Sequence, residues 1–206
     1  ATVIENLEKK SHGILIWRAL LQWLGGVGII VMALAVLPML SIGGMQLFKT
    51  ESYETPDKVV PKAASFAAGI SIVYITLTII WAFMLWGAGM PIFDSIAHAM
   101  TTLATGGYST KSESLAAFNS TTIEIIIIFG MLVGSLPFVH YLTLTKNGIK
   151  NLIKDDQVKL FLTLVFFVVL IMSFYLSLNN IPYIDALRLA SFNVISIITG
   201  TGFGTS

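Results

Sequence analysis

The chain has no cysteine and very little charge. The absence of cysteine excludes disulfide bonds and thiolate metal sites. Only 11% of its 206 residues are Asp, Glu, Lys or Arg, whereas a soluble domain carries about 25%, and the mean hydropathy is +0.84. The net charge of +1 argues against a nucleic acid partner. The composition therefore predicts an all-α integral membrane protein.

Four long stretches carry no charge at all: residues 19–48, 63–93, 125–145 and 160–184. A helix needs about 20 apolar residues to cross a membrane. We therefore expect a multi-pass protein whose helices lie near residues 17–47, 63–88, 121–145 and 160–178. The first stretch is too long, and lies too far from the N-terminus, for a cleaved signal peptide.

Lysine residues gather in two connecting segments, 49–62 and 146–159. Four alternating spans place both segments on the same side of the membrane, and the positive-inside tendency makes that side cytoplasmic. Pro56 and Pro61 predict that the first of these cytoplasmic loops is non-helical.

A repeat follows the second and the fourth span. "PIFDSIAHAMTTLATGGYST" (residues 91–110) and "PYIDALRLASFNVISIITGTGFGT" (residues 182–205) share an initial proline, an aspartate, an apolar middle and a glycine-aromatic ending. From the aspartate to the glycine that precedes the aromatic residue, the second copy is four residues longer than the first. This difference is close to one helical turn. The same helix face is therefore kept.

Each copy is too short to cross the membrane twice and too apolar for a solvated loop. We expect re-entrant half-helices at 91–103 and 182–198, followed by the first glycine loop (104–110) and the second glycine loop (199–205). An unpaired N–H or C=O group in lipid costs several kcal/mol, so such loops must line water or be buried in protein. They are expected to line an aqueous pore.

The residue types of these loops favour a cation. Glycine reaches positive φ freely, so that carbonyl groups can point into a narrow passage and replace a hydration shell, and the C-terminal ends of the half-helices add partial negative charge. No carboxylate lies in the loops, which disfavours a divalent-ion site. The predicted ion-binding residues are Thr105, Gly106, Gly107, Gly200, Thr201 and Gly202, flanked by Ala104, Tyr108, Thr199 and Phe203.

This order of span, half-helix and glycine loop resembles the Trk/Ktr/HKT superfamily of cation transporters, and most closely the bacterial Trk-type potassium uptake subunits of the TrkH family. The stretch "LLQWLGGVGIIVMALAVLPMLSIGGMQLFKTE" (residues 20–51) is similar to the second span of that family's first repeat. The family folds as four span–pore-loop–span repeats around one pore. The resemblance implies that residues 1–48 end repeat one, residues 63–145 form repeat two and residues 160–206 begin repeat three.

The resemblance also implies a function. We expect potassium uptake across the bacterial cytoplasmic (inner) membrane through a carbonyl filter made by four repeats, with two filter strands complete here, so that the chain alone does not conduct ions. Potassium is then the substrate, with no cofactor and no enzymatic activity. The implied partners are the remaining repeats, a second copy in a homodimer, membrane lipid and a cytosolic nucleotide-binding regulatory ring. Residues 146–159 could contact that ring or anionic lipid.

Other function classes fit less well. A relative that passes sodium, or couples transport to sodium or protons, remains an alternative within the same superfamily. A broken-helix solute transporter would present helix N-termini to its substrate, whereas both half-helices here present C-termini. A membrane enzyme would need a cluster of nucleophile, base or metal ligands, which the spans do not contain.

Five ionisable residues allow two interpretations each. Asp94 and Asp185 lie in the first turns of the half-helices, where capping is the stronger interpretation and ion ligation the weaker. His98 and Arg188 could tune the field at the pore mouth or pair with a neighbouring loop. His140 could relay protons or lie neutral and hydrogen-bonded to a neighbouring helix.

Overall fold

A computed structural model describes residues 6–40, 59–138, 140–142 and 155–205. Every element in these ranges is helical, as expected: η1 (Leu7–Lys9), α1 (His12–Leu40), α3 (Val59–Gly87), α4 (Ile92–Leu103), η3 (Ser114–Phe118), α5 (Thr121–Ser135), α8 (Asp156–Leu178) and α9 (Tyr183–Ile198). Most of the two predicted cytoplasmic loops lies outside the described residues.

The described part of each loop is its C-terminal end, where the next helix begins. α3 begins at Val59, so Pro61 lies in its first turn and the interpretation of that proline as part of a non-helical linker was wrong. A proline costs little there, because the N–H group that it lacks would have no partner inside the helix.

α8 begins at Asp156 because the preceding Asp155 caps it. The Asp155 carboxylate accepts hydrogen bonds from the backbone N–H groups of Gln157 (2.8 Å) and Val158 (3.1 Å). These bonds favour the ionised carboxylate, and the bond from Val158 is the main cause of the lowered pKa of Asp155. His140 lies next to the same group, with its Nε2 atom 3.1 Å from Asp155 Oδ2.

α5 ends earlier than the predicted span. Its last residue is Ser135, and Leu136 is extended, as expected for a residue that precedes a proline, here Pro137. By length and hydropathy, two segments of the described residues qualify as membrane spans, Ala67–Gly87 and Asp156–Leu178, while α5 is apolar but shorter.

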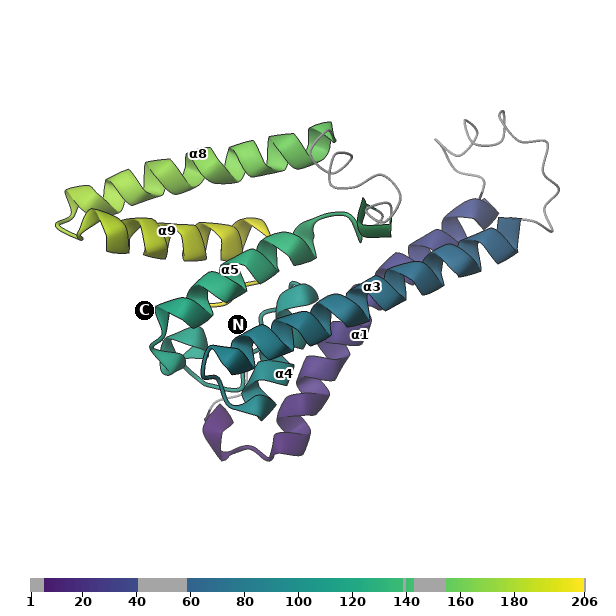
Figure 1. The fold of residues 1–206 in the computed structure, drawn as a ribbon, viewed down its shortest axis with the longest axis horizontal. Coiled ribbons are helices and arrows are strands. Elements are labelled where there is room, and N and C mark those ends of the chain that lie inside the picture. The colour runs from purple at the N-terminus through teal and green to yellow at the C-terminus, as the bar shows by residue number, and fades with distance from the viewer. Residues whose placement is uncertain (1–5, 41–58, 139, 143–154, 206) are drawn as a thin grey trace.

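The helices pack around α5 and α4. Figure 1 shows α1 and α3 side by side with α4 against them, and α8 paired with α9 on the other side of α5. Tyr74, Leu85, Ile127 and Phe192 are fully buried in the core that joins these helices. Large apolar side chains cover the outer surfaces of α3 and α8, where a membrane protein faces lipid: Ile72, Phe83, Leu160, Phe166 and Phe174 are all more than half exposed.

A glycine allows α3, α4 and α5 to meet closely. A Cβ atom on Gly130 of α5 would lie 2.3 Å from Trp81 Nε1 of α3 and 2.6 Å from Thr102 Cγ2 of α4. The Trp81 indole N–H donates to the Ile126 carbonyl of α5 at 3.0 Å. Small residues permit this kind of close helix approach in membranes, and here it fixes the position of α4.

We predict that Gly130→Ala lowers the thermal stability of the purified protein. The added methyl group must displace a packed tryptophan and a threonine, and overpacking of this kind costs about 1–3 kcal/mol. Thermal unfolding in detergent, followed by tryptophan fluorescence, measures the effect. Gly87→Ala is the matched control, since no described atom lies within 4 Å of its Cβ position apart from its chain neighbours and the adjoining backbone of α3. Equal midpoints for both variants and the unmodified protein would contradict the prediction.

Candidate functional site

α4 and α9 each lead directly into one glycine loop. α4 has 12 residues and α9 has 16, and both helices begin and end within one residue of the expected half-helices. Their last residues, Leu103 and Ile198, are followed by non-helical backbone through residues 110 and 205. The carbonyl ends of both helices therefore point toward the loops, where they concentrate partial negative charge.

The two loops have the same backbone pattern. φ is positive at Thr105 (49°) and Gly107 (71°) in the first loop, and at Gly200 (74°) and Gly202 (78°) in the second. Thr105 therefore corresponds to Gly200, and Gly107 to Gly202. Left-handed backbone is easy for glycine but uncommon for a β-branched residue, so Thr105 is held in its conformation by its surroundings.

A hydroxyl group supports each loop from its own helix. Thr101 of α4 donates to the Tyr108 carbonyl at 2.8 Å, and Ser196 of α9 donates to the Phe203 carbonyl at 2.7 Å. All four residues keep the correspondence set by the φ pattern. The internal repeat in the sequence is therefore also a repeat of backbone geometry and hydrogen bonding.

The two loops touch each other. A Cβ atom on Gly107 would lie 1.9 Å from the Thr201 carbonyl oxygen. Two independent constraints therefore require glycine at position 107: its φ is positive, and the second loop approaches its Cα closely. The first and second glycine loops are neighbours in space although they are far apart in sequence.

The segment that follows the first loop also contacts the second. Gly204 donates its N–H to Ser114 Oγ at 3.2 Å and accepts from the Leu115 N–H at 3.1 Å. On the other side, η1 packs on the same segment: Ser112 donates its N–H (2.7 Å) and its hydroxyl (2.8 Å) to the Glu8 carboxylate. These bonds, led by the one from the Ser112 N–H, lower the pKa of Glu8 to about 2.

Gln22 of α1 holds the first loop from outside. Its Nε2 atom donates to the Gly106 carbonyl at 2.6 Å, and its Oε1 atom accepts from the Tyr108 N–H at 3.1 Å. Arg18, one turn earlier, places its guanidinium 4.5 Å from the centre of the Tyr108 ring. The Gly106 carbonyl, one of the predicted ligands, is therefore directed at a side chain.

Sequence reasoning missed Gln22. The available signal was an amide side chain inside the uncharged stretch 19–48, where a polar group needs a partner. Its partner lies 84 residues away, which local pattern cannot reveal.

Asp94 and His98 bind the end of the first loop. Asp94 Oδ1 accepts from the Thr110 hydroxyl at 2.6 Å, so the capping interpretation of Asp94 was wrong: the loop folds back along α4 and offers a closer donor. His98 Nδ1 lies 2.7 Å from the Asp94 carbonyl oxygen, and its Nε2 lies 2.9 Å from Ser109 Oγ. A carbonyl can only accept, so Nδ1 carries the proton. Pairing with a neighbouring loop is confirmed for His98.

Glu124, paired with Arg188, binds the end of the second loop. Arg188 Nη1 of α9 lies 2.5 Å from Glu124 Oε2 in the first turn of α5, and the Thr205 hydroxyl donates to the other oxygen of Glu124. Asp185 is half-exposed and lies 3.9 Å from Arg188 Nη2. It caps no backbone N–H group of α9, so the capping interpretation was also wrong for Asp185. In the sequence, Glu124 only marked the edge of an uncharged stretch, and its role was missed.

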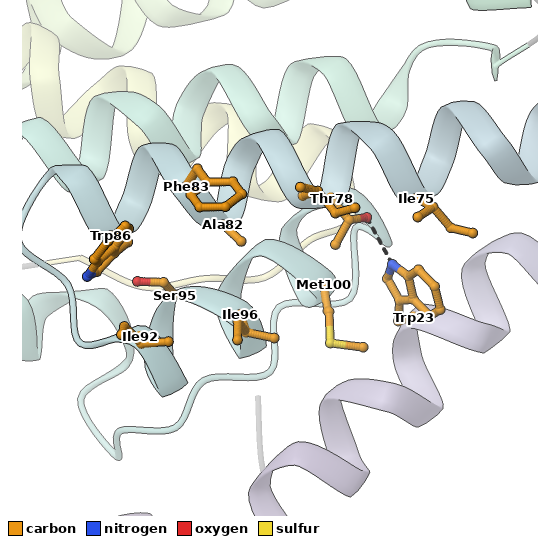
Figure 2. Close-up of a pocket in the computed structure, with 11 residues that line it drawn as sticks. Trp23, Ile75, Thr78, Ala82, Phe83, Trp86, Ile92, Ser95, Ile96 and Met100 are labelled. Atoms are coloured by element: carbon orange, nitrogen blue, oxygen red, sulfur yellow. Dashed lines mark hydrogen bonds between the residues drawn. The ribbon is translucent and has the colours of Figure 1, made fainter.

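A cavity of about 510 Å³ lies between α1, α3 and α4. Figure 2 shows Trp23, Phe83, Trp86, Ile96 and Met100 around it. The Thr78 hydroxyl accepts from the Trp23 indole N–H at 3.0 Å, and the rest of the lining is almost entirely apolar, so the cavity offers a cation no ligands. Within the described ranges, no group of three His, Cys, Asp or Glu side chains is placed to hold a metal ion.

Comparison with known proteins gives consistent results. A family model described as the cation transport protein TrkH matches residues 1–201. The Trk system potassium uptake proteins TrkI of Halomonas elongata and TrkH of Salmonella typhimurium are both 37% identical to the whole chain, which covers 42% and 44% of their respective lengths. The crystal structure of the potassium transporter TrkH from Vibrio parahaemolyticus matches with a TM-score of 0.85 and 34% identity, over 100% of this chain and 42% of that one.

The chain thus spans less than half the length of these relatives. The match with the family model extends from before α1 to Thr201, so it includes α4 with the whole first glycine loop and α9 with the first half of the second. The chain belongs to the TrkH family of cation transport proteins.

Proposed function

We propose that this chain supplies two adjacent quadrants of a potassium-selective filter in a multi-pass transporter of the bacterial cytoplasmic membrane. The observation that carries the proposal is the pair of glycine loops, which share one φ pattern and touch at Gly107 and Thr201. Two strands in this relation suit neighbouring positions around one axis. The names of the relatives, which are potassium uptake proteins, support potassium as the transported ion.

The ligands that we propose are backbone oxygens of residues 105–107 and 200–202, flanked by Ala104, Tyr108, Thr199 and Phe203. Carbonyl oxygens can replace the hydration shell of potassium, and the C-terminal ends of α4 and α9 favour a cation at the same place. Gly106 has a different part from its neighbours, because its carbonyl accepts from Gln22. We therefore propose that Gly106 mainly anchors the strand and that, of these three residues, Thr105 and Gly107 present their carbonyl oxygens to the ion.

Two quadrants leave the ring open, so the proposal requires the remaining repeats as partners. In it, residues 1–48 end repeat one, residues 63–145 form repeat two and residues 160–206 begin repeat three, with cytoplasmic loops at 49–62 and 146–159. A second copy of the transporter, membrane lipid and a cytosolic nucleotide-binding ring are further proposed partners. The proposed assembly conducts an ion through a pore lined by carbonyl oxygens and carries out no covalent chemistry.

We predict that the full-length transporter restores growth of an uptake-deficient strain in low potassium and that Gly107→Ser abolishes this growth. Serine at this position requires a left-handed backbone and meets the Thr201 carbonyl at 1.9 Å, so the two strands must separate. Gly204→Ala is the matched control within a loop, because its Cβ position has only an ordinary contact at 3.9 Å. Failure of the unmodified transporter to support growth would refute the proposed function.

We also predict that Gln22→Leu lowers the initial rate of potassium uptake by about tenfold, the effect of about 1.4 kcal/mol. Leucine fills a similar volume but leaves the Gly106 carbonyl and the Tyr108 N–H without their partner. Uptake of ⁸⁶Rb⁺ into cells gives the rate, corrected for the amount of transporter in the membrane. Leu21→Ala, at the exposed neighbouring position, serves as the control. A Gln22→Leu rate within twofold of the control would show that the amide is dispensable.

A further inference from the structure

A threonine hydroxyl meets a buried carboxylate at the outer end of each glycine loop. Thr110 donates to Asp94 at 2.6 Å, and Thr205 donates to Glu124. Each threonine follows its key glycine, Gly107 or Gly202, by three residues, so the two contacts occupy the same place in the repeat. Asp94, Glu124 and Thr110 are all buried.

The two carboxylates do not correspond in sequence. Asp94 lies on the half-helix of its own repeat, whereas Glu124 lies on α5, the helix of the preceding repeat. The sequence counterpart of Asp94 is Asp185, but α9 is one turn longer than α4, and that turn moves its first residues away from the loop by about 6 Å. Asp185 is half-exposed there. Glu124 takes its place beside the threonine.

Two unrelated positions therefore provide the same contact at equivalent points of the two loops. Duplication of one residue does not account for this, because Asp185, at the position equivalent to Asp94, does not contact Thr205, whereas Glu124 of a different helix does. A functional requirement that the threonine hydroxyl be held at this point of the loop explains both contacts. We propose that the pairs Thr110–Asp94 and Thr205–Glu124 position the outer ends of the two filter strands and thereby set their selectivity.

This inference rests on the proposed function and names residues that act through the strand, without contact with the ion. A hydrogen bond to an ionised acceptor is short and stronger than one between neutral groups. It fixes the strand three residues beyond its key glycine, while Thr101 or Ser196 fixes it one residue beyond. These two fixed points hold the segment that directly follows the ligand residues. The strand then cannot shift along its own direction, and the carbonyl oxygens before it keep the spacing that suits potassium.

The test uses the full-length transporter in proteoliposomes and measures the ratio of potassium to sodium permeability. Thr110→Val and Thr205→Val keep the side-chain shape and remove the hydroxyl, and each is expected to lower the ratio by about tenfold, since a hydrogen bond to a charged group contributes on this scale. Thr110→Ser and Thr205→Ser keep the hydroxyl and are expected to stay within twofold of the unmodified ratio.

Thr76→Val is the matched control. Thr76 is an exposed threonine of α3 whose hydroxyl donates to its own helix at Ile72, and its loss should leave the ratio unchanged. Asp94→Asn and Glu124→Gln give a second measurement if the valine variants do not fold, because they keep an acceptor and remove its charge. They are expected to lower the ratio less than valine does.

Unchanged ratios in folded valine variants would overturn the inference, and so would serine variants as defective as the valine variants. Unfolded valine variants together with unchanged ratios for Asp94→Asn and Glu124→Gln would also overturn it, because the pairs would then only stabilise the fold. These outcomes are distinct from failure of the proposed function, in which the unmodified transporter itself shows no potassium uptake.

Discussion

Every peptide group that leaves a helix at membrane depth needs a hydrogen-bond partner in the protein or contact with a water-filled passage, and the arrangement of this chain follows from that constraint. The two glycine loops are short segments of non-helical backbone surrounded by apolar helices. Several of their polar groups find partners in three directions: Gln22 of α1 on one side, Thr101 and Ser196 from the helices that lead into the loops, and Ser114 of η3 at the outer end. The helices thus act as a source of donors and acceptors as well as an apolar shell.

This arrangement depends on helices that approach closely. Gly130 lets α5 contact α3 and α4, and Gly26 brings α1 to 3.2 Å from the Ala104 backbone, as measured to an added Cβ atom. Such contact places α4 so that one face, with Ile92, Ile96 and Met100, borders the apolar cavity. The opposite face of α4, with Asp94, His98 and Thr101, forms the hydrogen bonds to the first loop. A 12-residue helix can do both because residues three and four apart share a face.

Much of this was accessible from the sequence. Pro91 and Pro182, followed by apolar residues and then by glycines, located α4 and α9 to within one residue. The argument that glycine supplies positive φ holds at Gly107, Gly200 and Gly202, but in the first loop Thr105 takes the left-handed position. At Gly106 a side chain would instead displace the Gln22 amide, whose atoms lie 2.4–2.8 Å from the Cβ position. That contact, like the ones made by Asp94 and Glu124, depends on tertiary packing that no local pattern encodes.

Under the proposed function, the difference between Thr105 and Gly200 has a consequence for how such a pore can change over time. In a pore of four identical subunits, every substitution appears four times around the axis, and its effect on the ion is multiplied accordingly. In a pore whose quadrants are successive parts of one chain, a substitution alters one quadrant while the others keep their geometry. Thr105 is such a change, a residue disfavoured in left-handed backbone that is held in place by an otherwise repeated frame. In the proposed pore, a substitution can therefore adjust selectivity through one quadrant at a time.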